Sequence, residues 1–165
     1  MIYNKEQIDL YLKKMEYNDK IKIDYNTLCK LQIAHLTHIP YENIDVLNRK
    51  PISLESQDLF DKMIVKARGG YCFELNGLYS NLLKSLGFNV TNLAGRFIYQ
   101  DGNTRMRLHR ILKIDIDDKS YISDVGVLSE LSRKSLELEV GKVQNDGKCD
   151  YKFEYNQKQE GEYKA

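Results

Sequence analysis

Residues 68–87, which read RGGYCFELNGLYSNLLKSLG, contain the two signals that decide the fold of this chain. The pair Gly69-Gly70 interrupts any helix that precedes it. From Cys72 onward, apolar residues recur at the three- and four-residue spacing of a helix until Gly87. The pattern predicts a strongly apolar helix over 72–86 that begins directly after a glycine turn, so that a cysteine stands at the helix N-terminus.

Three further amphipathic helices are expected before this turn. The first follows Asn4, which forms a capping-box pattern with Gln7. The second runs from about Asn26 to His38, because Pro40 prevents it from continuing. The third is expected to be capped by Ser53 and carries four apolar residues on one side, namely Leu59, Phe60, Met63 and Ile64.

After Gly87 the hydrophobic period changes from that of a helix to that of a strand. Strands are expected at Val90–Tyr99, Arg105–Ile116 and Tyr121–Val127, separated by turns at 101–103 and 117–119. The alternation in 148–156 allows one more strand, and the polar residues 157–165 are expected to fray. The sequence therefore predicts an α+β fold with a helical domain over 1–87, an antiparallel β domain over 88–156 and a polar tail over 157–165.

Composition excludes several classes of function. A chain of 165 residues with 42% hydrophobic residues can bury a core, and 25 Lys and Arg against 24 Asp and Glu leave no basic field for nucleic acid or an anionic membrane. The N-terminal residues lack the apolar region of a signal peptide. Three separated cysteines, Cys29, Cys72 and Cys149, fit neither a paired disulfide set nor a CxxC metal site. We expect a cytoplasmic protein.

Cys72 is the candidate nucleophile. At a helix start after two glycines, its sulfur lies near unpaired backbone N–H groups and the positive end of the helix dipole, which favours the thiolate. The glycines also allow a substrate to approach the backbone closely. The alternative is that Cys72 is a small buried apolar residue, which is the common role of a free cysteine.

His109 and Asp124 are the candidate partners of Cys72. His109 lies within one predicted strand, and Asp124 lies within the next, so that a hairpin brings the two side chains beside each other. The alternatives are a half-buried strand histidine and an aspartate that binds local backbone. Cysteine, histidine and aspartate in this order, with the cysteine on a helix and the others on adjacent strands, form the arrangement of papain-like thiol enzymes.

A metal site is not expected. His35 and His38 are three residues apart on a predicted helix, but no third ligand stands at a matching spacing. We interpret both histidines as packing or helix-end residues.

Several motifs resemble those of one enzyme family. Residues 68–76 resemble the signature R-G-G-x-C-x-E-x-N of the arylamine N-acetyltransferases, which include N-hydroxyarylamine O-acetyltransferases. Upstream, Leu31-Gln32, His35 and the segment 39–45, which reads IPYENID, resemble the family's L-Q-x-x-H-x-x-x-I-P-F-E-N-x-D segment. Downstream, 109–112 and 123–126 resemble its histidine strand and its D-V-G-F-G strand. The similarity covers roughly residues 1–145.

The resemblance implies an acetyl-CoA-dependent ping-pong transfer to an arylamine, arylhydrazine or N-hydroxyarylamine through a thioester on Cys72. His109 would hold the proton and Asp124 would orient the imidazole. The resemblance also assigns supporting roles. Backbone N–H groups near Phe73 and Leu108 would form the oxyanion hole; Tyr41, Phe73 and Val127 would line the acceptor pocket; and Arg68, Glu42, Glu74 and Asn76 would brace the turn.

The chain departs from the family in length. Family members have a helical domain, a β-barrel domain and a third α/β domain, and we expect the third to be absent here and the barrel to be incomplete. An open barrel edge would favour self-association, so a homo-oligomer is one expectation. Two other functions stay open: a relic that binds a ligand or partner without catalysis, and a thiol hydrolase or amide synthase that keeps the cysteine chemistry.

Overall fold

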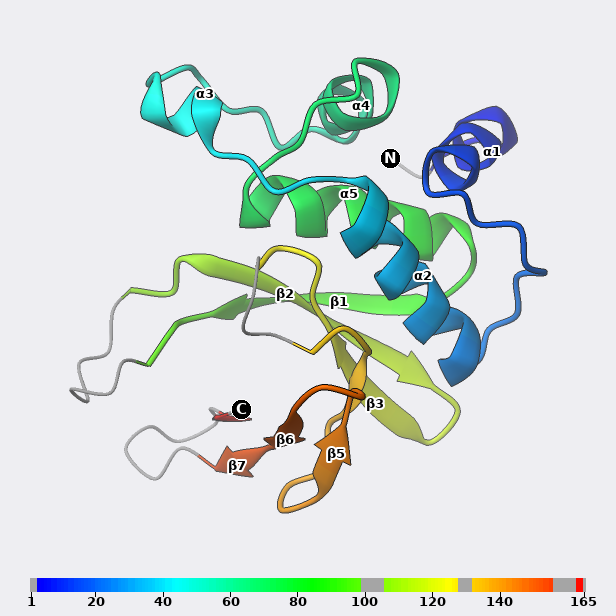
Figure 1. The fold of residues 1–165 in the computed structure, drawn as a ribbon, viewed down its shortest axis with the longest axis vertical. Helices are drawn as coiled ribbons and strands as arrows, with labels where there is room; N and C mark the ends of the chain where they lie inside the picture. Colours follow the sequence, from blue (N-terminus) through cyan, green and yellow to red (C-terminus); the bar gives the residue numbers. More distant parts are fainter. Residues whose placement is uncertain (1–2, 99–105, 128–131, 156–162, 165) are drawn as a thin grey trace.

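The computed structural model describes residues 3–98, 106–127, 132–155 and 163–164. Helices form the first half of the chain and strands form the second, as the α+β prediction required. Figure 1 shows the helices gathered on one side of the main sheet, with α5 extending along that sheet. The smaller strands of the C-terminal part lie on the other side, away from the helices.

The first two helices begin at side-chain caps. Helix α1 spans Lys5–Lys14, and Asn4 and Gln7 form the predicted capping box, with N–H to oxygen distances of 2.9 and 3.1 Å. Helix α2 spans Tyr25–His38 and is capped by Asp24, whose carboxylate accepts the Thr27 N–H at 2.7 Å. The second helix thus begins slightly before the predicted position and ends, as predicted, before Pro40.

The third predicted helix differs from expectation. A short helix, α3 (Ile44–Leu47), precedes it without having been predicted. Helix α4 (Ser56–Phe60) then continues as a π-helix, η1 (Asp61–Val65). The prediction of Ser53 as the cap was wrong, because Glu55 occupies the N-cap position and the Ser53 hydroxyl donates to Asp58. Apolar spacing over so few residues does not distinguish an α turn from a π turn, which adds only one residue.

Helix α5 (Cys72–Ser85) is the centre of the structure. It begins at the predicted cysteine and ends at Leu86, followed by Gly87 with φ +99°, a left-handed conformation that suits glycine at a helix end. Most of its residues are buried, because the helix packs between the other helices and the sheet. The prediction for this element is confirmed to within one residue.

The main sheet is an antiparallel meander in the order β1-β2-β3-β4, formed by β1 (Asn89–Gly95), β2 (His109–Ile116), β3 (Lys119–Ser123) and β4 (Leu136–Glu137). A two-residue turn at 117–118 joins β2 to β3, and Asp117 there has φ +51°. The first three strands are shorter than predicted, and the predicted turn at 101–103 lies outside the described residues, as do Tyr99 and Arg105.

Two small hairpins complete the described chain. Strands β5 (Val143–Asn145) and β6 (Asp150–Lys152) pair with each other, and so do β7 (Glu154–Tyr155) and β8 (Tyr163–Lys164). The single strand predicted within 148–156 is therefore split between two sheets. The expectation that 157–165 frays does not hold for 163–164, whose backbone pairs with β7. The described strands form open sheets rather than a closed barrel, in keeping with the expectation that the barrel-like sheet is incomplete.

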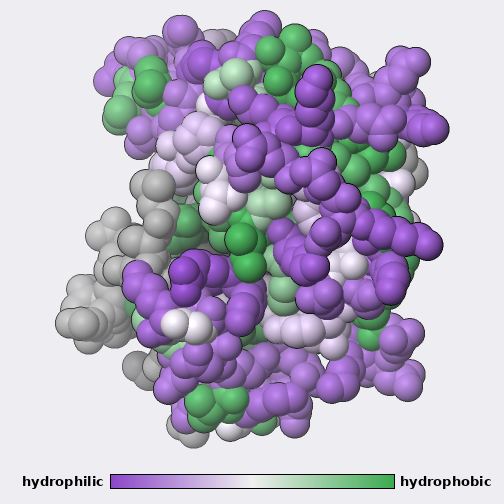
Figure 2. Space-filling view, turned by 45° about the vertical axis from the view of Figure 1, so that its right-hand side comes forward, coloured by the Kyte–Doolittle hydropathy of each residue, from purple (hydrophilic) through white to green (hydrophobic). Residues whose placement is uncertain are grey.

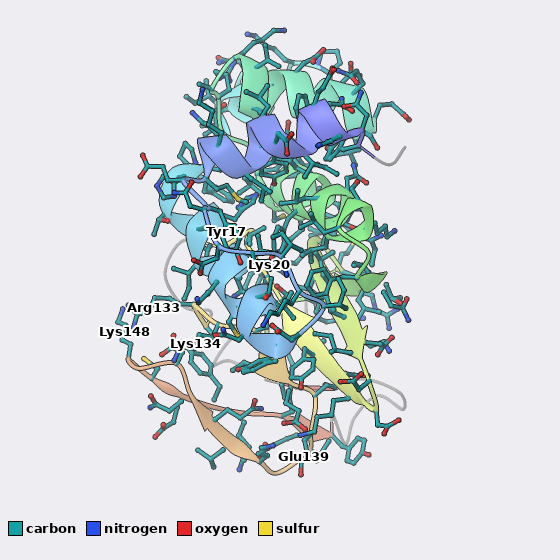
Figure 3. The ribbon with its side chains drawn as sticks, turned by 90° about the vertical axis from the view of Figure 1, so that its right-hand side faces the viewer. Tyr17, Lys20, Arg133, Lys134, Glu139 and Lys148 are labelled. Carbon is teal, nitrogen blue, oxygen red and sulfur yellow. The ribbon has the colours of Figure 1, made fainter. Side chains whose placement is uncertain are left out.

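A buried carboxylate organises the turn between β5 and β6. Asp146 accepts the backbone N–H groups of Lys148 and Cys149 and, from the segment before β4, that of Arg133, at 2.8, 2.9 and 3.0 Å. These contacts keep the pKa of Asp146 well below its usual range, led by the Arg133 N–H. Figure 3 shows Arg133, Lys134 and Lys148 close together at this turn.

The core lies between the helices and the inner face of the sheet. Apolar side chains from α1, α2, α4, η1 and α5 meet those of β2 there, including Tyr11, Leu28, Met63, Leu78, Leu112 and Ile114. Figure 2 shows that hydrophilic side chains dominate one outer face, where apolar side chains form separate patches. Among the described residues, no helix has the length and apolar character needed to cross a bilayer.

His35 occupies an unusual place within this core. Its side chain is completely buried between the rings of Tyr11 and Tyr79, with ring centroids 6.0 and 5.2 Å away. Neither of its ring nitrogens has a hydrogen-bond partner in the described part of the chain. Burial alone lowers the pKa of His35 to about 3, so the folded protein keeps this ring neutral.

Acid should therefore destabilise the fold through His35. The unfolded chain protonates this residue below its ordinary pKa of 6.5, whereas the folded chain resists until about 3. The stability contributed above pH 6.5 is thus lost as the pH falls toward 3, at about 1.4 kcal/mol per pH unit. Urea unfolding at several pH values should show a shallower dependence for His35→Leu. His38→Gln is the control, and parallel curves for wild type and His35→Leu would contradict the prediction.

Candidate active site

The turn that presents Cys72 is held against the segment after α2. The carbonyl of Gly70 accepts the Glu42 N–H at 2.9 Å, and the Gly70 N–H donates to the Pro40 carbonyl at 3.3 Å. A side chain at Gly69 could not fit, since its Cβ would lie 2.1 Å from that same Pro40 oxygen. The two glycines therefore allow the backbone segments around Pro40 and Gly70 to touch.

Cys72 is the first residue of α5 and is partly exposed. Its sulfur lies 3.7 Å from the carbonyl oxygen of Leu108, which precedes β2. On another side Gly126 approaches so closely that an added Cβ would lie 2.8 Å from the Cα of Cys72. The cysteine is thus placed at the meeting point of α5, the start of β2 and the segment that follows β3.

His109 and Asp124 lie together, as the hairpin argument predicted. The Nε2 atom of His109 lies 2.5 Å from Oδ2 of Asp124, and both side chains are about 6% exposed. The other ring nitrogen, Nδ1, is buried and has no hydrogen-bond partner with good geometry among the described residues. With Nε2 engaged by Asp124, only Nδ1 is left to exchange a proton with the neighbouring Cys72.

The second oxygen of Asp124 is held by the helix that carries Cys72. Its Oδ1 accepts the Gly126 N–H at 2.8 Å and the Asn76 amide at 2.9 Å. The same Asn76 amide donates to the Arg110 carbonyl at 2.6 Å and accepts the Val125 N–H at 3.1 Å. Asn76 is completely buried, and its bonds with Asp124 and Val125 are shielded from water.

The electrostatics of His109 follow from these contacts. Burial lowers its pKa, but the hydrogen bond with Asp124 and the contact with Cys72 outweigh burial and raise the pKa to about 9. The imidazole is therefore protonated at neutral pH, and its positive charge lies between a carboxylate and a sulfur. Such a cation stabilises the thiolate form of a neighbouring cysteine.

The residues expected to line an acceptor pocket lie around this centre. Burial, and to a smaller degree the nearby Cys72, raise the pKa of Tyr41. Phe73 follows Cys72 on α5, and Val127, which is partly buried, follows Gly126. Sequence reasoning missed Phe97, whose ring centroid lies 5.1 Å from that of His109. The signal was weak, because an aromatic residue in a predicted strand is common.

Three of the four expected bracing residues, Arg68, Glu42 and Glu74, belong to a network of ion pairs. Arg68 binds Glu42 at 2.7 Å and Asp45 at 3.1 Å. Lys62 binds the same Asp45 at 2.9 Å and also Glu74 at 2.8 Å. Asp45 and Lys62 were not predicted as site residues, because charged residues in short helices are usually solvated. The hydrogen bond from Lys62 is the largest contribution that lowers the pKa of Asp45 to about 2.

Other features lie apart from the site. Two open hollows are each lined in part by Tyr17, a residue labelled in Figure 3, and neither is lined by Cys72, His109 or Asp124. Within the described ranges, no group of three His, Cys, Asp or Glu side chains is arranged to hold a metal ion. Metal-free chemistry stays a prediction.

The comparison with known families identifies the class of this protein. Residues 24–165 match a family model described as N-acetyltransferase. A curated relative, the arylamine N-acetyltransferase / N-hydroxyarylamine O-acetyltransferase of Salmonella typhimurium, is 39% identical over 124 residues, which cover 74% of this chain and 44% of the relative. The chain belongs to the arylamine N-acetyltransferase family, as its motifs indicated.

Solved structures agree with this assignment. The arylamine N-acetyltransferase from Salmonella typhimurium superposes with a TM-score of 0.86 and 33% identity over 92% of this chain and 56% of that chain. The enzyme from Mycobacterium marinum, solved in complex with CoA, gives a TM-score of 0.84 and 31% identity over 91% of this chain and 57% of that chain. The chain thus spans about half the length of the relatives it matches.

Gly126→Ala should damage the site by crowding. The added Cβ would lie 2.6 Å from the Asn76 amide nitrogen and 2.9 Å from the Cβ of Cys72. We expect a loss of about 1–3 kcal/mol in the free energy of unfolding, measured with urea, together with slower alkylation of Cys72. Gly95→Ala is the control, since its nearest contact would be an ordinary 3.7 Å. Equal effects of the two substitutions would contradict this account.

Asp124→Asn should lower the pKa of His109. Without the carboxylate, burial, which disfavours the charged ring, is opposed only by the contact with Cys72. The pKa of His109 should therefore fall clearly below about 9. NMR titration of the histidine ring protons measures this directly. A pKa that stays near 9 in the variant would show that Asp124 is not the group that holds the proton on His109.

Proposed function

We propose that this chain transfers acetyl groups from acetyl-CoA to an arylamine, arylhydrazine or N-hydroxyarylamine through a thioester on Cys72. The observation that carries the proposal is the arrangement of His109. Its Nε2 is fixed by Asp124 at 2.5 Å, while its buried Nδ1 is left for the cysteine at the start of α5. Membership of the arylamine N-acetyltransferase family supplies the donor and the class of acceptor.

In the first half of the reaction, the Cys72 thiolate attacks the carbonyl carbon of acetyl-CoA. The carbonyl electrons shift onto oxygen and return as the bond to the CoA sulfur breaks. The departing CoA thiolate takes the proton held by His109, so that CoA leaves as a thiol and the imidazole becomes neutral. Asp124 holds the ring in the orientation that keeps its Nδ1 on the cysteine side.

In the second half, the acceptor nitrogen or oxygen attacks the thioester carbonyl. Neutral His109 takes the proton that the acceptor loses, and the bond to the Cys72 sulfur breaks. The products are the acetylated acceptor and the thiolate–imidazolium pair from which the cycle began. Dividing the transfer in two avoids crowding both bulky substrates around one carbonyl.

The neighbouring residues take supporting roles in this proposal. Backbone N–H groups near Phe73 and Leu108 stabilise the oxyanion, because a helix start offers donors without a partner. Tyr41, Phe73 and Val127 contact the aromatic acceptor, and Phe97 joins them, given its position beside the His109 ring. Arg68, Glu42, Glu74 and Asn76 hold the turn and the helix in place.

A thiol hydrolase is the second candidate, and one observation favours it. Cys72 is only partly buried and Leu108 beside it is 59% exposed, so water can reach a thioester at this position. In that case the thioester would turn over without an amine. The dependence of turnover on an added arylamine separates the two functions.

Intact-mass spectrometry tests the proposal. Wild-type protein incubated briefly with acetyl-CoA should gain one acetyl group, and the group should be discharged when an arylamine is added. Cys72→Ala should gain none, because the nucleophile is missing. His109→Ala should acquire acetyl at least about a hundredfold more slowly, because general acid–base help is worth that much. A folded wild type that stays unmodified at high acetyl-CoA would overturn the proposed function.

A further inference from the structure

We infer that Lys62 is a positioning residue for Cys72 and that it acts through the buried carboxylate of Glu74. The inference deepens the proposed function, because any chemistry at Cys72 needs its sulfur held at His109. It concerns the placement of the thiol itself, however, and can therefore be tested without an acyl donor.

The first step is the burial of Glu74. Its side chain is 3% exposed and lies in the first turn of α5. Its Oε2 accepts the N–H of Tyr71, the residue directly before Cys72, at 3.1 Å, and its Oε1 accepts the Lys62 ammonium at 2.8 Å. A carboxylate this deeply buried is costly unless a cation pairs with it, and within the described residues Lys62 is the cation recorded in contact with it.

The second step is that Lys62 holds the other end of the same turn. Its backbone carbonyl accepts the N–H of Arg68 at 3.0 Å, and its ammonium binds Asp45, which in turn binds the Arg68 guanidinium. Lys62 thus contacts both ends of the turn between η1 and α5. The contact after η1 is with Arg68, and the contact at the start of α5 is through Glu74. The Lys62 side chain is only 18% exposed, so these ion pairs are shielded from most of the solvent.

The third step is the strain between these two points. Ala67 has φ +53°, a left-handed conformation that is unfavourable for a residue with a Cβ. Such a conformation persists only where its surroundings determine it. Ala67 lies two residues after the end of the π-helix that carries Lys62, and a π turn within a helix often marks a functional position. The contacts of Lys62 and Arg68 are among the local restraints that keep the chain in this path.

The fourth step is the close packing of the turn against Glu74. A Cβ at Gly70 would lie 2.8 Å from the Cβ of Glu74 and 3.2 Å from its Oε2, so the turn rests directly on this side chain. If Glu74 loses its cation, its charge must move toward water. The Tyr71 N–H then loses its acceptor, and the start of α5, with Cys72, shifts relative to His109. A displacement of about 1 Å at a reacting group can cost a hundredfold in rate.

The test uses charge removal from each member of the pair. Lys62→Met removes the ammonium and keeps the chain length, whereas Glu74→Gln keeps an acceptor for the Tyr71 N–H without the charge. The double variant leaves no unpaired charge. Lys30→Met is the matched control, because Lys30 forms a comparable 2.6 Å ion pair with Asp19 on the surface. All variants, and the wild-type reference, carry Cys149→Ser, since Cys149 is an exposed thiol.

The readout is the rate of Cys72 alkylation by iodoacetamide across pH, at a temperature where circular dichroism shows folded protein. Lys62→Met should react roughly tenfold to a hundredfold more slowly, with a pH profile that approaches that of a cysteine without a histidine partner. The double variant should recover to within about threefold of wild type, because its buried pair is neutral. Lys30→Met should match wild type.

Three outcomes would overturn the inference: an unchanged rate and profile in Lys62→Met, a double variant as slow as Lys62→Met, or an equal loss in Lys30→Met. If Lys62→Met does not fold, the alkylation rate of Glu74→Gln is compared with that of the double variant. A much slower rate in the double variant would equally contradict the inference. If wild-type Cys72 is alkylated rapidly but never accepts acetyl from acetyl-CoA, the proposed function is contradicted and the inference about Lys62 is not.

Discussion

The amide of Asn76 joins the two halves of this protein at a single buried point. It extends from the helix that carries Cys72, donates to the Arg110 carbonyl and to Asp124, and accepts the Val125 N–H. A buried amide must satisfy these groups or leave several polar atoms without partners, at about 1–3 kcal/mol each. The distance between helix α5 and strands β2 and β3 is therefore fixed by hydrogen bonds as well as by apolar packing. The relation between Cys72 and the His109–Asp124 pair depends on this constraint.

Much of this arrangement could be predicted from the sequence, for identifiable reasons. The helix from Cys72 to Gly87 has a strong apolar period and a glycine at each end, so its limits were predicted almost to the residue. The contact of His109 with Asp124 followed from a short hairpin, because a short link between two strands brings side chains on both of them together. Local signals were strong enough at these places to determine the tertiary contact.

The features that could not be predicted depend on contacts distant in the sequence. The π-helix at 61–65 has the same apolar spacing as an ordinary helix, and the roles of Lys62 and Asp45 appear only when α3, η1 and α5 meet. Phe97 beside His109 is a comparable case. The incomplete barrel was expected from the family resemblance rather than from the residues, and the described strands do form open sheets. Ion pairs and ring contacts between elements distant in the chain carry no signal in a single sequence.

Two carboxylates near Cys72 are used in the same way. Glu74 accepts the Tyr71 N–H with one oxygen and Lys62 with the other, and Asp124 accepts the Gly126 N–H with one oxygen and His109 with the other. Tyr71 precedes Cys72 in the chain, and Gly126 touches it in space. Each carboxylate thus fixes a backbone segment that borders the cysteine.

Apolar side chains of similar size could stabilise the fold as much as these ion pairs do, since buried ion pairs contribute little net stability. They could not accept a backbone N–H, and they would leave the helix start free to rotate. A charged pair on each side restricts that rotation, because any movement that breaks a pair exposes an unpaired charge to the protein interior. The network is therefore better explained by the need to place one sulfur accurately than by a need for stability.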